Sequence, residues 1–150
     1  EMFVHDMAQK DIVFNTQFSI NTEMIYSDSL RISQIIINLL SNALKFTHSG
    51  GSITFQVSEM KSSDERAYYQ VRIEDTGVGI PKDIQEKIFE SMELDSSVDV
   101  KVPAEGVALG LVICKIVANR LEGSIALDTS FEKGTRIIFT HPIRTNNYCN

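Results

Sequence analysis

The sequence has little of what a cross-linked or membrane-inserted protein needs. It holds two cysteines and three prolines among 150 residues, and no apolar run approaches the length of a membrane span. Cys114 falls in a segment expected to be a buried helix and Cys149 lies near the C-terminus, so we expect no disulfide and a reducing compartment. The first residues carry no signal-peptide pattern. These features exclude a disulfide-built scaffold and argue against direct membrane insertion.

Positive charge is also scarce. The chain has 14 basic and 20 acidic side chains, which gives a formal net charge of −6. Because nucleic-acid backbones select basic surfaces, we expect no nucleic-acid partner, although a few local donors are enough to hold a nucleotide. The sequence has no P-loop pattern, no protein-serine-kinase signature and no internal repeat. Its length and its 43% of apolar residues suit a single domain with a proper core.

The order of periodic segments predicts the fold class. Strands flanked by helices on one side indicate an α+β protein, a two-layer α/β sandwich with a mixed, largely antiparallel sheet. Residues 93–105 have no clear period, as is typical of a lid over a site. We expect helices over residues 1–11, 27–46, 82–89 and 108–121, and strands over 12–20, 52–60, 69–75, 124–129 and 135–140.

The helix over residues 27–46 carries a thin polar stripe. Most of its circumference is apolar, so we expect it to be largely buried. A buried amide without a partner costs about 1–3 kcal/mol, so Asn38 and Asn42, one turn apart, need groups to bond. They either tie down neighbouring loops or present carbonyl oxygens to a hydrated cation, with Lys45 facing a phosphate. The polar exceptions, spaced three or four apart, are Arg31, Gln34, Asn38, Asn42 and Lys45.

An acidic-glycine motif further along the chain favours the ligand interpretation. Asp75-Thr-Gly77-Val-Gly79-Ile80 follows an alternating strand-like run. A buried carboxylate at a strand end can accept a hydrogen bond from an exocyclic amine such as that of adenine; its alternative role is a strand-end cap. Gly77 and Gly79 let the backbone turn sharply and approach a ligand closely.

These motifs resemble the catalytic, ATP-binding domain of sensor histidine kinases, within the wider group of gyrase, Hsp90 and MutL ATPases. The likeness covers essentially the whole chain, in the family's order and spacing. The segments that carry it are Asn38–Thr47, similar to the asparagine box; Asp75–Ile80, similar to the first glycine box; Ile88–Glu90, similar to the start of the phenylalanine box; Gly106–Leu111, similar to the second glycine box; and Gly134-Thr135, which opens the closing strand.

The resemblance implies a Bergerat-type ATP-binding fold with an ATP lid, and it assigns one group of residues to the base. Asp75 would accept from the adenine amino group. Gly77 and Gly79 would let the lid's first turn pass close to the base, and Ile80 would pack near the ring. Thr135 would hydrogen-bond near the adenine.

A second group is assigned to the phosphates and to Mg²⁺. Asn42 and Asn38 would bind Mg²⁺ through neutral carbonyls, and Lys45 would offer a point charge to the phosphates. These three residues form the implied catalytic set. The other residues assigned to nucleotide binding are Phe89, Gly106, Leu109, Gly110 and Leu111, where Gly106 and Gly110 open a helix whose N-terminal amides favour phosphate.

The implied activity is transfer of the γ-phosphoryl group of Mg-ATP to a histidine on a separate dimerisation domain. That domain would precede Glu1, so we expect the chain to be a fragment of a larger sensor kinase. The fragment would face the cytoplasm, with a response-regulator receiver domain as an indirect partner. His5 does not match the family's acceptor motif. Asn38 occupies the position where the gyrase-like and Hsp90-like ATPases carry a water-activating Glu, so hydrolysis is not the expected purpose.

Two departures from the family pattern leave an alternative open. Ala108 replaces the middle glycine of the second glycine box, which costs on the order of 1 kcal/mol if the backbone there is left-handed and matters little if φ is negative. Met92 replaces the second aromatic of the phenylalanine box, and methionine specifies a lid position poorly. The alternative is a degenerate module that binds nucleotide weakly or not at all and acts through protein contacts.

Overall fold

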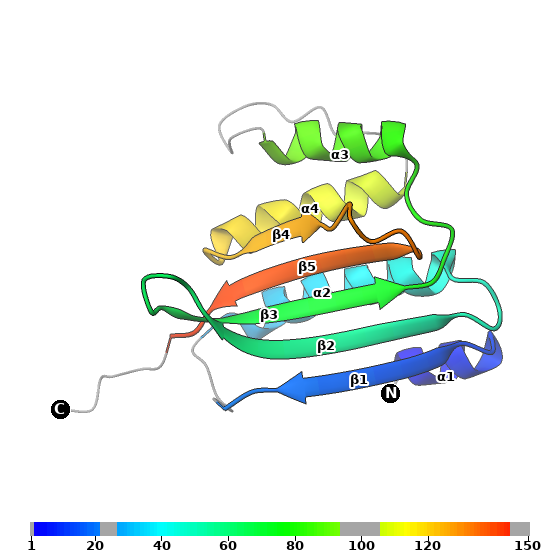
Figure 1. Ribbon diagram of the computed structural model, residues 1–150, viewed down its shortest axis with the longest axis horizontal. Coiled ribbons are helices and arrows are strands. Elements are labelled where there is room, and N and C mark those ends of the chain that lie inside the picture. The colour runs from blue at the N-terminus through cyan, green and yellow to red at the C-terminus, as the bar shows by residue number, and fades with distance from the viewer. Residues whose placement is uncertain (1, 22–26, 94–105, 145–150) are drawn as a thin grey trace.

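The computed structural model describes residues 2–21, 27–93 and 106–144, with the backbone alone described at 2, 88–93 and 106–109. Five strands form one sheet in the order β1-β2-β3-β5-β4, and helices cover one of its faces (Figure 1). The expected α/β sandwich is confirmed. The elements are α1 (Met2–Gln9), β1 (Val13–Ser19), α2 (Ser29–Phe46), β2 (Ser52–Lys61), β3 (Ala67–Asp75), α3 (Lys82–Glu93), α4 (Gly106–Arg120), β4 (Ser124–Leu127) and β5 (Thr135–Pro142).

The sheet is mixed and largely antiparallel, as expected. Strands β1 and β2 run parallel, while β2–β3, β3–β5 and β4–β5 are antiparallel pairs. β5 extends past the predicted end at residue 140 because β3 provides partners as far as Tyr68, which pairs with Pro142. The expected lid covers residues 93–105. All of it after residue 93 lies outside the described residues. None of the described helices is long and apolar enough to cross a membrane.

The prediction that α2 is largely buried is wrong in part. Its N-cap is Asp28, whose side chain accepts from the Arg31 amide at 3.1 Å. Leu30 is 75% exposed and Ile37 45% exposed, because α2 packs on the sheet with one face and against α4 with a flank. Leu30 and Ile37 line the open groove between α2 and α4. The buried residues of α2 are Ile35, Leu39, Leu40 and Ala43.

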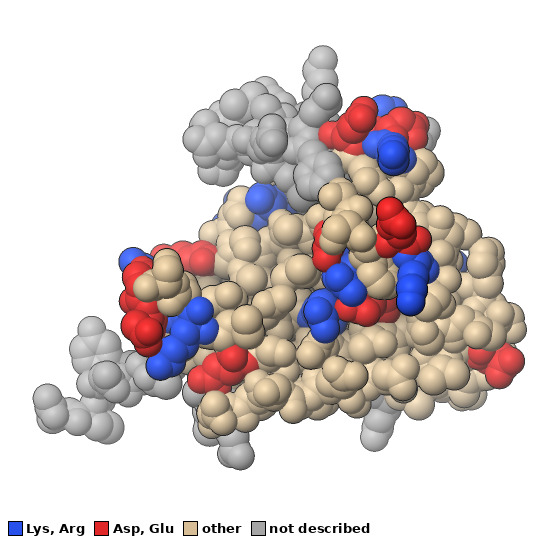
Figure 2. Space-filling view, viewed as in Figure 1, with Lys and Arg blue, Asp and Glu red and all other residues tan. Residues whose placement is uncertain are grey.

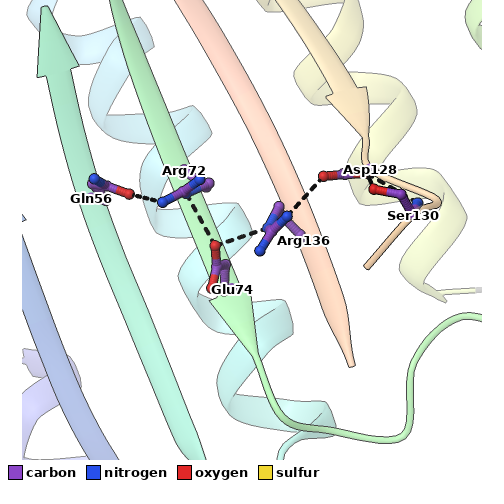
Figure 3. A network of polar contacts seen from close by, with 6 residues as sticks. All are labelled: Gln56, Arg72, Glu74, Asp128, Ser130 and Arg136. Atoms are coloured by element: carbon purple, nitrogen blue, oxygen red, sulfur yellow. Dashed lines mark hydrogen bonds and ion pairs between the residues drawn. The ribbon is translucent and has the colours of Figure 1, made fainter. Parts of the chain in front are cut away.

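The sheet face opposite the helices carries a ladder of charged and polar side chains (Figure 3). Arg72 bonds Gln56 on β2 and pairs with Glu74 at 3.0 Å. Arg136 on β5 pairs with Glu74 at 2.8 Å and with Asp128, just after β4, at 3.0 Å. Figure 2 shows a mixed group of acidic and basic side chains near the centre of this face, with further charged groups toward its edges. The ladder therefore ties four neighbouring strands together where β3 ends and β5 begins.

Candidate functional site

The end of β3, the start of β5 and the C-terminal half of α2 enclose a cavity of about 170 Å³. A cavity of about 150 Å³ can accommodate benzene, so this space suits one planar ring system. The polar side chains on its wall are Asn42, Asp75 and Thr135. The apolar residues around them, with Gly79, are Leu39, Ala43, Phe46, Ile73, Val78, Ile80, Pro81, Ile84 and Ile137.

Asp75 is the buried acid of this cavity. It is the last residue of β3, it is only 6% exposed, and it lies opposite Thr135 of β5. Burial raises the pKa of its carboxyl, and hydrogen bonds from the backbone amides of Gly77 and Thr135 partly offset that rise. The Gly77 amide donates to Oδ1 at 2.9 Å. A carboxylate has more lone pairs than two amides use, so Asp75 can also accept from an amine in the cavity.

Two glycines let backbone segments meet around Asp75. A Cβ on Gly77 would lie 2.3 Å from the carbonyl oxygen of Phe46, at the end of α2. Gly134 has φ +155°, and a Cβ there would lie 1.9 Å from the carbonyl oxygen of Asp75. Both distances are far shorter than any real carbon contact, so no other residue fits without moving the backbone. Gly134 was not predicted as a site residue, although its place directly before Thr135 was a signal.

A second hollow, of about 810 Å³, lies between α2 and α4. Asn42 lines both spaces and therefore marks the point where the cavity and the groove meet. Its Nδ2 lies 3.5 Å from Oδ1 of Asn38, which orients the Asn42 carbonyl oxygen away from that contact. A Cβ on Gly110 would come within 2.7 Å of the same Asn38 oxygen, so glycine lets α4 approach the amide pair. A ligand with its ring in the cavity would pass Asn42 into the groove.

The structure does not gather every predicted site residue around these spaces. Lys45 is exposed, with Nζ 5.3 Å from the centroid of the Phe46 ring, and it lines neither hollow. Leu111 is buried in the core and lines neither. Gly106 is the first residue of α4. The side chains of Phe89 and Leu109 lie outside the described part of the chain.

Ala108 is placed by the start of α4. The predicted helix begins at Ala108, but α4 begins at Gly106, so Ala108 is its third residue. An α-helical residue has negative φ, and alanine is the best helix former. The replacement of glycine by Ala108 would matter only if the backbone there were left-handed. In α4 it is not. The backbone at Met92 belongs to α3, and its side chain lies outside the described part.

Ile80 was predicted to pack near the ring, but the other apolar residues of the cavity wall were missed by sequence reasoning. Leu39 and Ala43 lie beside Asn42 on α2, and Ile73 and Ile137 lie two residues from Asp75 and Thr135 on the same face of their strands. Their spacing relative to the polar residues could have indicated a place on the cavity wall, but any core residue shows the same spacing.

The family model for histidine kinase-, DNA gyrase B- and HSP90-like ATPases matches residues 27–145. The chain belongs to this family. It falls with the sensor histidine kinases, whose ATPase domains serve two-component signalling, because its relatives and structural neighbours are of that kind.

Relatives of this histidine kinase ATPase domain are much longer than the chain. The adaptive-response sensory kinase SasA of Microcystis aeruginosa is 33% identical over 141 residues, 94% of this chain and 35% of that protein. SasA of Thermosynechococcus vestitus is 36% identical over 131 residues, which cover 87% of this chain and 32% of that protein. The autoinducer 2 sensor kinase/phosphatase LuxQ of Vibrio harveyi is 32% identical over 134 residues, which cover 89% of this chain and 15% of that protein. The chain thus spans about a third or less of these proteins.

Solved structures share the fold of the domain. The nucleotide-free catalytic domain of histidine kinase ThkA superimposes with a TM-score of 0.74 at 26% identity, over 96% of this chain and 88% of that one. Full-length ShkA in complex with AMPPNP gives a TM-score of 0.70 at 26% identity, over 96% of this chain and 28% of that one.

Proposed function

We propose that this domain binds Mg-ATP with the base in the 170 Å³ cavity and donates the γ-phosphoryl group to a histidine on a separate dimerisation domain. The observation that carries the proposal is a buried carboxylate, Asp75, on the wall of an apolar, ring-sized cavity that meets a wider groove at Asn42. Such a cavity selects a flat heterocycle, and the acid selects one that carries an amine.

The base would be held by few polar contacts and many apolar ones. Asp75 would accept from the adenine amino group, and Thr135, on the facing strand, would hydrogen-bond nearby. Ile80, Gly77 and Gly79 form the turn that would lie along the ring. Burying the amine against a carboxylate that is itself shielded from water makes that hydrogen bond strong and specific.

The residues at the junction of the two hollows fit a magnesium ion. Asn42 and Asn38 offer neutral carbonyl oxygens, and Mg²⁺ takes few protein ligands beside waters and phosphate oxygens. When bound, the ion would neutralise phosphate charge. Lys45 has a long flexible side chain that would turn from solvent toward the phosphates. The first turn of α4, from Gly106 to Gly110, would direct backbone amides to them.

Transfer, rather than hydrolysis, suits this set of side chains. Among the described residues that line the cavity and the groove, the one carboxylate is Asp75, at the base end. Asn38, an amide, cannot take a proton from water. The incoming histidine nitrogen would form the bond to phosphorus as the bond to the ADP oxygen breaks, so positioning and charge stabilisation are the whole task.

The partners follow from the transfer. The acceptor histidine and its dimerisation domain would belong to the same, longer protein, and a response-regulator receiver domain would take the phosphoryl group from that histidine. The reaction needs ATP, so this domain would work in the cytoplasm. The lengths of the SasA relatives, about three times the matched part, leave room for such domains.

Calorimetric titration with a non-hydrolysable ATP analogue, with and without Mg²⁺, tests the proposal. We expect the wild-type chain to bind in a Mg²⁺-dependent manner, and Asn42→Ala to lose most of that dependence because a metal ligand is gone. Ser63→Ala, in the exposed turn after β2, serves as the control. No binding of the wild type at millimolar analogue would contradict the proposal and favour the degenerate module.

Nucleotide affinity is expected to depend on the protonation of Asp75. Its pKa is raised by burial, so the carboxylate takes up a proton at a higher pH than an ordinary aspartate does. A protonated acid no longer accepts well from an amine, so affinity should be level near neutral pH and fall as the pH drops through that raised pKa. Titration of the analogue over a series of pH values measures this. A weakening of the same size in Asp75→Asn would assign the effect to another group.

A further inference from the structure

Strand β1 is an edge without the usual protection. It borders the five-stranded sheet, and no described strand pairs with its outer side (Figure 1). Its sequence, VFNTQFS, contains no charged residue and no proline, and every residue except Phe14 is exposed. Natural proteins normally place lysine, proline or a bulge on such an edge, because it can pair with another chain.

The outward-facing backbone groups of β1 can be identified. The Val13 amide donates to the Gly51 carbonyl at 3.0 Å, which directs it toward β2. Successive amides of a strand alternate in direction, so the amide and carbonyl groups of Phe14, Thr16 and Phe18 point away from β2. These three residues present a regular row of free donors and acceptors.

We propose that this edge pairs with β1 of a second copy of the chain, antiparallel and centred on Thr16. With Thr16 on the two-fold axis, Phe14 of each copy faces Phe18 of the other. The outward groups of the three residues then oppose one another, which is the arrangement that antiparallel hydrogen-bonded pairs require. Two five-stranded sheets would join into one continuous sheet.

The side chains of β1 complement themselves in this register. On the helix-covered face, each Phe14–Phe18 pair flanks the central pair of Thr16 residues, and aromatic and Thr–Thr cross-strand pairs are favourable. Phe18 is 62% exposed and makes an edge contact with Phe55 at 6.0 Å, so a second ring would extend an existing cluster. On the opposite face, Asn15 faces Gln17 and amides can pair.

Charge favours this edge over other surfaces for self-association. The chain carries a net charge of −6, so two copies repel one another over most approaches. In Figure 2 the surface that follows β1 is tan along the strand, and the nearest charged groups in view are acidic ones near its two ends. An uncharged partner edge is therefore the best match, and β1 itself is one.

Sedimentation of the 150-residue chain at increasing concentration tests the proposal. We expect a monomer–dimer equilibrium, and we expect Thr16→Lys to weaken the dimer by about tenfold or more because two like charges meet on the axis. Ser63→Lys adds the same charge at an exposed turn and should leave the equilibrium unchanged. A wild type that stays monomeric, or a dimer that Thr16→Lys does not weaken, would overturn the proposal.

Cross-linking tests the register. In a Cys149→Ser background, Thr16→Cys should form an intermolecular disulfide on oxidation, because a hydrogen-bonded pair holds its Cα atoms about 5.5 Å apart. Gln17→Cys is the matched control, since in this register it faces Asn15 and its own copy lies about 7–8 Å away on the diagonal. Equal cross-linking of the two variants would refute the register. Nucleotide binding should be the same in both, because β1 does not line the cavity.

Discussion

Replacing Asp75 by asparagine is expected to weaken nucleotide binding by about ten- to a hundredfold. A hydrogen bond to a charged group is worth about 1.5–3 kcal/mol, and each 1.4 kcal/mol is a factor of ten. The geometry makes the loss larger than for a simple change of charge. The Gly77 amide needs an acceptor, so an asparagine would keep its oxygen on Gly77 and turn its NH₂ group toward the cavity. Two donors, that NH₂ and the adenine amine, would then face each other.

The fold itself should not suffer from Asp75→Asn. A raised folded-state pKa means that the charged carboxylate opposes folding at neutral pH, an effect that vanishes once the pH is below the unfolded-state pKa. The neutral amide removes that cost but offers one acceptor oxygen where the carboxylate offers two to the amides of Gly77 and Thr135, so the free energy of unfolding at pH 7 should stay close to that of the wild type. Titration with the ATP analogue and urea unfolding measure the two quantities. Asp6→Asn, on the exposed side of α1, is the control. Unchanged affinity in Asp75→Asn would remove Asp75 from the base site.

Periodicity predicted the fold well because the sheet and helices each bury one face. The alternation in β2 and β3 and the three-to-four spacing in α2 are direct consequences of that burial. The same reasoning overestimated how deeply α2 is buried. Leu30 and Ile37 are apolar like their neighbours, but which apolar face meets the sheet depends on where α4 packs. That placement is a tertiary fact and has no signature within α2.

The site shows the same division between local and tertiary information. Asp75 and the glycines after it carry a local signal, since an acid and a flexible turn at a strand end are unusual together. Thr135 lies 60 residues further along and reaches Asp75 only because β3 and β5 pair. The conformation at Ala108 depended on whether α4 begins two residues earlier than its apolar pattern indicates. Lys45 shares the polar stripe of Asn42, yet at the end of α2 its side chain extends into solvent.

Gly134→Ala is expected to have the largest effect on stability, lowering the free energy of unfolding by about 3 kcal/mol or more. Two costs combine at this position. Its φ of +155° disfavours any side chain, and a Cβ would overlap the Asp75 carbonyl oxygen at 1.9 Å and lie 3.0 Å from the Gly77 amide nitrogen. That amide holds the Asp75 carboxylate, so any shift that relieves the overlap also moves the acid. Urea unfolding and titration of the analogue should both register the change.

Gly50→Ala separates these two costs. Gly50 has φ +82°, but a Cβ there would meet nothing within 4 Å, so alanine should cost only about 1 kcal/mol. Both variants place a side chain at positive φ, and only Gly134→Ala adds a collision, so the collision should account for most of the difference between them. If Gly134→Ala costs no more than Gly50→Ala, the β3–β5 junction is loose enough to open. In that case the close backbone packing behind Asp75 would not fix the position of the acid in the cavity. The ion pair between Glu74 and Arg136 on the opposite face of the sheet would then be the next interaction to test by mutation.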